Sequence, residues 1–117
     1  MSLSKEDIQQ LTQAAKKWAK GLPQKIKIWF FGSQINGRST DDSDFDIAIQ
    51  FSDEIEILDR SFLWDEVQDR WKYDLEKIVR KKVHLVLYEP DQNYKLNDFL
   101  NENSILVYDP TKSDLEI

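Results

Sequence analysis

Hydrophobic residues recur along the chain at two spacings, and these spacings predict its helices and strands. Over residues 4–22, apolar side chains return every three or four positions, the period of an amphipathic helix, and this helix is expected to end near 21–23. Its first residues, Ser-Lys-Glu-Asp at 4–7, resemble a capping box. Residues 25–31 instead alternate between apolar and other side chains, which predicts a strand.

The same two periods continue to the end of the chain. We expect a turn or short helix over 33–43, strands over 44–51, 83–88 and 105–108, and helices over 55–78 and 94–103. No repeat or linker interrupts this order, and a single α/β (α+β) domain over residues 1–117 is therefore predicted.

Composition narrows the class of protein. The 117 residues carry 16 Lys and Arg against 22 Asp and Glu, a net charge of −6, and contain no cysteine. A disulfide scaffold, a thiolate zinc site and a cysteine nucleophile are thereby excluded. No apolar run is long enough to span a membrane and no signal-peptide core is present, so we expect a cytoplasmic protein with no membrane partner. Its acidity argues against a broad nucleic-acid surface, and a charged substrate would need metal ions or a local cationic pocket.

The residues suited to chemistry are Gly32-Ser33 and, after ten intervening residues, Asp44-Phe45-Asp46. Glycine lets a backbone approach a phosphate closely, and Ser33 can donate hydrogen bonds to phosphate oxygens. Two carboxylates at i and i+2 of a strand share a face and can hold hard cations. The phase of the strand selects Asp44 and Asp46, on a face expected to be open, and leaves Asp42 in the preceding loop. The alternative interpretation is a polar turn beside a solvated strand face.

Two other groups of residues have structural interpretations. The four tryptophans, Trp18, Trp29, Trp64 and Trp71, are expected to be core or interface aromatics rather than platforms for nucleic-acid bases. The basic cluster at 80–82 is expected to complement the carboxyl end of the long helix.

The sequences FFGSQINGR at 30–38 and SDFDIAI at 43–49 resemble the signature of the minimal nucleotidyltransferases of the DNA polymerase β-like superfamily. Residues 99–100 and 105–108 also resemble that family's closing helix and strand. The match extends over nearly the whole chain, and its specific part is confined to 30–49.

This resemblance implies a nucleotidyltransferase fold, a small mixed β-sheet packed with helices. It also implies transfer of a nucleoside monophosphate, with AMP from ATP the expected case, to a hydroxyl group on a protein or small molecule. Gly32 and Ser33 would contact the triphosphate, and Asp44 and Asp46 would bind Mg²⁺ or Mn²⁺. Arg38 would help hold phosphate, or else is a solvated loop arginine. Gln34 departs from the basic residue often found after the Gly-Ser pair in the family.

The third predicted strand departs further from the family. Its members commonly place a third carboxylate in a Val-Asp-Leu-Val type segment, where the residue binds metal and accepts a proton. Here Val-His-Leu-Val at 83–86 puts His84, the chain's single histidine, at that position. Three interpretations stay open: His84 is the catalytic base, it marks a weakened descendant, or it is an ordinary histidine on a half-buried strand face.

The resemblance also suggests a partner. Minimal members of the family often accompany a helical HEPN-type protein as antitoxin and toxin, so a HEPN-type protein is a possible partner. A second hypothesis is therefore a weakened transferase domain that acts by binding a partner or sensing nucleotide. Exposed apolar residues on the long helix, such as Trp64 or Trp71, would favour it. The sequence leaves the acceptor, the preferred base and the oligomeric state open.

Overall fold

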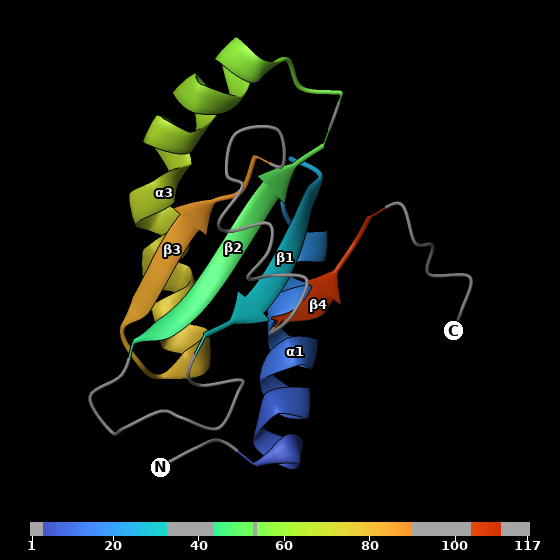
Figure 1. The fold of residues 1–117 in the computed structure, drawn as a ribbon, viewed down its shortest axis with the longest axis vertical. Helices are drawn as coiled ribbons and strands as arrows, with labels where there is room; N and C mark the ends of the chain where they lie inside the picture. The colour runs from blue at the N-terminus through green and yellow to red at the C-terminus, as the bar shows by residue number, and fades with distance from the viewer. Residues whose placement is uncertain (1–3, 33–43, 53, 90–103, 111–117) are drawn as a thin grey trace.

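The computed structural model describes residues 4–32, 44–52, 54–89 and 104–110. The elements are α1 (Lys5–Lys20), β1 (Ile26–Phe31), β2 (Phe45–Phe51), α3 (Ile57–Val79), β3 (Val83–Leu87) and β4 (Ser104–Tyr108), as Figure 1 shows. Each begins and ends within a residue or two of its predicted bounds. The predicted turn or helix over 33–43 and the predicted helix over 94–103 lie outside the described residues.

The four strands form one mixed sheet in the order β3-β2-β1-β4. β1 lies in the middle and pairs antiparallel with both β2 and β4. β2 and β3 pair in parallel, and α3 makes the crossover between them that parallel strands require. The predicted fold class, a small mixed sheet packed with helices, is confirmed.

The main core lies between one face of this sheet and the two helices. The alternating apolar residues predicted to share a face in β1 and β2 are fully buried there, namely Ile26, Ile28, Phe30, Phe45, Ile47 and Ile49. Ala15 and Ala19 of α1 pack against the same cluster, as do Trp71, Leu75 and Val79 of α3. Alternation along each strand thus decides which face the helices cover.

Trp71 is the centre of an aromatic group that joins the two helices to the sheet. Its ring lies 5.7 Å from Trp18, 5.8 Å from Phe51 and 6.4 Å from Trp64, measured between ring centroids. The indole N–H of Trp18 donates a hydrogen bond to Asp74 of α3 at 3.2 Å. These three tryptophans are structural aromatics, as predicted.

The helix ends are fixed by local hydrogen bonds. The predicted capping box at Ser4 is present: the Ser4 hydroxyl accepts from the Asp7 backbone N–H at 3.0 Å, and the Asp7 carboxylate accepts from the Ser4 N–H at 3.2 Å. α3 ends at Arg80, whose φ of 58° is left-handed. Near its start, Arg60 donates to the Ile55 carbonyl at 2.6 Å and pairs with Glu89 at 3.0 Å, which ties the helix to the chain just after β3.

Among the described residues, no helix combines the length and apolar character that crossing a bilayer requires.

Candidate active site

Three neighbouring strands bring Gly32, Asp46 and His84 together at one end of the sheet. Asp46 pairs with Phe31, the residue before Gly32, in the antiparallel register of β1 and β2. The same Asp46 pairs with His84 in the parallel register of β2 and β3. The carboxyl end of β1 therefore meets the amino ends of β2 and β3 at a single edge of the sheet.

Gly32 lies directly against the carboxylate of Asp46. Its φ is +81°, a left-handed conformation that glycine adopts without strain. A Cβ added at this position would lie 1.9 Å from Oδ2 of Asp46 and 2.8 Å from its Cγ. Glycine is therefore required here because any side chain would occupy the place of the Asp46 carboxylate. This reason is separate from the role near phosphate that the sequence predicts for Gly32.

His84 contacts Asp46 from the other side. Its Nδ1 lies 3.0 Å from Oδ1 of Asp46, and the side chains of His84 and Asp46 are 60% and 22% exposed. In the tautomer that carries its proton on Nδ1, His84 donates to the carboxylate and keeps a lone pair on Nε2. The ring is thus oriented by a carboxylate and remains open to solvent.

Asp44 lies immediately before β2 and is exposed. The neighbouring Phe45 N–H donates to the Lys82 carbonyl at 2.8 Å, which joins the start of β2 to the start of β3. In this strand Phe45 faces the core, whereas Asp44 and Asp46 do not. The structure therefore places both aspartates at the edge occupied by Gly32 and His84.

The face of β2 that carries Asp46 is exposed to solvent near Asp46 and is covered by other side chains farther along the strand. Ala48 is fully buried, and it belongs to a second apolar cluster with Phe31 and Tyr88. Trp29 packs against this cluster, with its ring 5.3 Å from that of Tyr88 in an edge-to-face arrangement. The expectation of an open face is wrong for this stretch of β2, because aromatic side chains from β1 and from the end of β3 meet over it.

The site offers two carboxylates as ligands for a metal ion. In the part of the chain that the structure describes, no three His, Asp or Glu side chains lie close enough to hold an ion by themselves. Asp44 and Asp46 supply two carboxylates, which suits Mg²⁺, an ion that commonly takes one or two protein carboxylates and completes its shell with phosphates and water. Ser33 and Arg38 lie outside the described residues, and their roles stay predictions.

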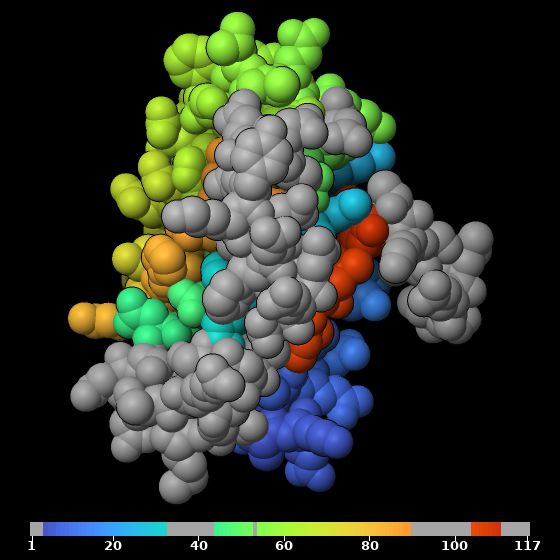
Figure 2. All heavy atoms as spheres, in the orientation of Figure 1, coloured from blue at the N-terminus to red at the C-terminus, as the bar shows by residue number. Residues whose placement is uncertain are grey.

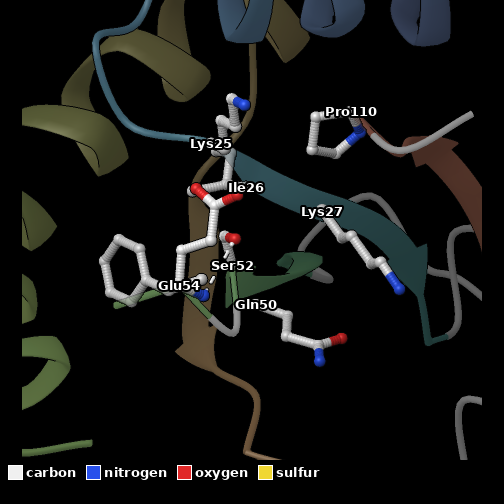
Figure 3. A pocket seen from close by; sticks show the side chains of 8 residues that line it. Lys25, Ile26, Lys27, Gln50, Ser52, Glu54 and Pro110 are labelled. Carbon is white, nitrogen blue, oxygen red and sulfur yellow. Dashed lines mark hydrogen bonds between the residues drawn. The ribbon is translucent and has the colours of Figure 1, made fainter. Parts of the chain in front are cut away.

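A separate cavity of about 360 Å³ lies at the opposite end of the sheet, seen in Figure 3. It is lined by Lys25, Ile26, Lys27, Gln50, Phe51, Ser52, Glu54 and Pro110. Five residues of strand, roughly 17 Å, separate its Ile26–Phe51 pair from the Phe31–Asp46 pair. Its lysines extend in different directions, and Lys27 pairs with Asp109 at 3.7 Å. The groups suited to chemistry on phosphates are thus those around Asp46.

The long helix does not expose the tryptophans considered for a partner surface. Trp71 is only 3% exposed, and Trp64 packs against the core. The exposed apolar residues of α3 are instead Leu58 and Phe62, with Ile57 and Tyr73 less so. Leu58 and Phe62 also have helical spacing, and that spacing alone does not distinguish them from the buried apolar residues of α3.

Two kinds of comparison with known proteins give matches. The family model described as polymerase β nucleotidyltransferase matches residues 9–113. A crystal structure of a toxin–antitoxin with AMP-PNP is 21% identical over 92% of this chain and 74% of its own, with a TM-score of 0.52. A structure of a tri-AMPylated Shewanella oneidensis HEPN toxin in complex with MNT antitoxin is 18% identical over 92% of this chain and 76% of its own, with a TM-score of 0.51. A search among curated proteins gave no match.

These two structures share the fold of this chain at low sequence identity, while the family model covers most of its length, including the Gly32, Asp44, Asp46 and His84 positions. The family suggested by the motif between residues 30 and 49 is thereby confirmed. The chain belongs to the polymerase β nucleotidyltransferase family.

Proposed function

We propose that this protein transfers a nucleoside monophosphate, AMP from ATP, to a hydroxyl group on a protein or small molecule. The observation that supports the proposal most is the contact of Asp46 with both Gly32 and His84, with Asp44 beside them. These residues combine a close backbone approach, two carboxylates and an exposed imidazole at one edge of the sheet.

The proposed roles follow from the chemistry of each side chain. Gly32 and Ser33 contact the triphosphate, and Arg38 helps to hold it. Asp44 and Asp46 hold Mg²⁺ or Mn²⁺, which when bound offsets phosphate charge and favours alignment of the attacking oxygen with the leaving group. The acceptor hydroxyl attacks the α-phosphorus and pyrophosphate leaves. His84, oriented through Nδ1 by Asp46, takes the hydroxyl proton on Nε2.

A HEPN-type protein is the partner we propose. The solved complex with a tri-AMPylated HEPN toxin pairs that toxin with an MNT antitoxin of the same fold as this chain. A protein hydroxyl on such a partner is therefore the first acceptor to examine.

The test is a transfer assay with the purified protein. Each labelled nucleoside triphosphate is incubated with Mg²⁺ or Mn²⁺ and candidate acceptors, including a HEPN-type protein. We expect transfer by the native protein and its loss in Asp44→Asn/Asp46→Asn. Glu6→Gln, which removes an exposed carboxylate from α1, is the matched control and is expected to keep full activity.

His84 is tested in the same assay. A general base contributes about 10²- to 10⁴-fold to a rate, so His84→Ala is expected to lower transfer by at least about 100-fold. A His84→Ala protein with full activity would rule out the proposed base.

A second candidate function is favoured by the same residue. With histidine in place of the family's third carboxylate, the site carries less negative charge for holding cations. A weakened transferase domain of this kind would act by partner binding or nucleotide sensing. It would show no transfer in the assay above, and detection of nucleotide by calorimetry would then separate sensing from partner binding alone.

A further inference from the structure

The side of α3 that faces away from the core carries a continuous stripe of side chains. Leu58, Phe62, Asp65, Asp69 and Tyr73 follow one another at spacings of four, three, four and four residues, so they lie on one side of the helix. We call these five residues the outer stripe. At 1.5 Å per residue it is about 22 Å long, or four helical turns.

The apolar end of the outer stripe is open to solvent. Leu58 is 75% exposed and Phe62 is 71% exposed, and at i and i+4 they are neighbours on the helix surface. In Figure 1 the first turns of α3 extend beyond the ends of the strands, and Figure 2 shows the atoms of this end of the helix at the upper rim of the molecule. The residues of α3 that are buried, Trp71, Leu75 and Val79, all lie in its second half. A leucine and a phenylalanine exposed side by side are typical of a surface that binds a partner.

The surroundings of these two residues are acidic. Asp59, Asp65, Glu66 and Asp69 are all exposed on the part of α3 that carries Leu58 and Phe62 or directly follows them. Two arginines lie in the same stretch: Arg60 is only 14% exposed and is paired with Glu89, whereas Arg70 is exposed but lies about two helical turns beyond Phe62. Negative charge therefore surrounds an apolar patch.

This charge discriminates between possible occupants. If the same surface of a second copy packed on the outer stripe, carboxylates would face carboxylates, which is unfavourable. A partner with cationic side chains beside an apolar ridge would instead satisfy both parts of the stripe. A helix fits the dimensions, because about 15 residues of helix span the stripe and present side chains at the matching i and i+4 spacing.

We propose that the outer stripe is a docking surface for a basic amphipathic helix of a partner protein. The apolar ridge of that helix covers Leu58 and Phe62, and its lysines or arginines face Asp65 and Asp69. The stripe begins at the end of α3 that extends past the sheet, whereas Asp46 and His84 lie at the edge where β3 begins. Docking therefore uses residues separate from those proposed for transfer.

The test measures fluorescence anisotropy of two labelled helical peptides with the full chain. Both peptides carry the same leucine ridge over about 15 residues, flanked by lysine in one and by glutamate in the other. We expect the lysine-flanked peptide to bind and the glutamate-flanked peptide not to bind. Equal binding of both peptides, or binding of neither, would overturn the proposal.

Variants locate the binding. Leu58→Gln/Phe62→Gln is expected to weaken binding of the lysine-flanked peptide by at least about tenfold, and Asp65→Asn/Asp69→Asn by several-fold. Leu106→Gln on β4 is the matched control, since Leu106 is 39% exposed and lies off the helix, and it is expected to bind like the native chain. Unchanged binding by Leu58→Gln/Phe62→Gln would refute the assignment to the outer stripe.

Two further measurements separate this proposal from its alternatives. Asp44→Asn/Asp46→Asn is expected to bind the lysine-flanked peptide normally, so loss of transfer and loss of docking are distinguishable. Sedimentation equilibrium of the native chain is expected to show no dimer that depends on Leu58 and Phe62. A dimer that Leu58→Gln/Phe62→Gln abolishes would show that a second copy occupies the surface, contrary to the proposal.

Discussion

At the scale of the residue, Asp46 is the point at which the parts of the site meet. One carboxylate oxygen lies where a Gly32 side chain would be, and the other is 3.0 Å from His84. The spacing of Gly32 and Asp46 could be predicted from the sequence as a motif. Their contact could not, because it depends on the register of β1 against β2 and on a left-handed φ that local sequence does not determine.

Replacing Gly32 is expected to disturb both the backbone and Asp46. In Gly32→Ala the left-handed conformation costs about 1–2 kcal/mol, and the new Cβ would displace the Asp46 side chain. We expect urea unfolding to show a loss of about 2 kcal/mol or more. Gly21→Ala is the control, since Gly21 has a φ of −81° and its nearest neighbour would be 3.5 Å away, and its unfolding free energy is expected to change by less than about 0.5 kcal/mol. Equal effects at the two glycines would contradict the close contact.

Replacing His84 with a carboxylate tests whether the edge can take up a metal ion. His84→Asp sets a second negative charge beside Asp46, which is expected to lower stability by about 1 kcal/mol, or a few degrees in Tm, when divalent cations are absent. Mg²⁺ or Mn²⁺ is expected to raise the Tm of this variant more than that of the native protein. His84→Asn, which adds no charge, is the control for lost packing. The same rise in all three proteins would show that the ions act elsewhere.

At the scale of the element, periodicity predicts where a helix lies better than which way its side chains face. In α3 the apolar positions Leu63, Val67, Trp71, Leu75 and Ile78 follow one face, and they pack against the core. Leu58 and Phe62 belong to a different phase of the same helix and are exposed. Counting apolar residues at three- and four-residue spacing merges the two sets, so periodicity alone does not separate the buried face from the outer stripe.

The amino end of α1 offers a test at this scale. Ser4→Ala removes the acceptor for the Asp7 N–H and leaves that donor to water, which is expected to reduce the free energy of unfolding by about 1 kcal/mol. Urea denaturation followed by circular dichroism measures this loss. Ser61→Ala, a change of the same type at an exposed position inside α3, is expected to be neutral or slightly stabilising because alanine favours helix. An equal loss in both variants would show that the cap contributes nothing specific.

At the scale of the whole molecule, alternation in the strands indicates the core face and leaves the second face undetermined. The mixed sheet and its helices could be expected from the order of elements and the family resemblance. Burial of Ala48 and Tyr88 on the second face could not, because it arises where aromatic side chains from separate strands meet. The molecule therefore has two apolar clusters, and the second one adjoins the proposed active site through Phe31, the cross-strand partner of Asp46.

The second cluster makes the stability of the whole protein sensitive to alkaline pH. Burial raises the pKa of Tyr88, because the charged phenolate is poorly solvated there. The folded state thus keeps this proton to higher pH than the unfolded state does. The resulting stability is fully present below the ordinary tyrosine pKa of about 10 and is lost as pH rises through the raised pKa of Tyr88.

The Tm of the native protein is therefore expected to fall above about pH 10, and that of Tyr88→Phe to fall less steeply. Tyr73→Phe is the control, because it removes the hydroxyl group of an exposed tyrosine on α3. If Tm declined with equal slope at alkaline pH in both variants, the role of Tyr88 would be contradicted.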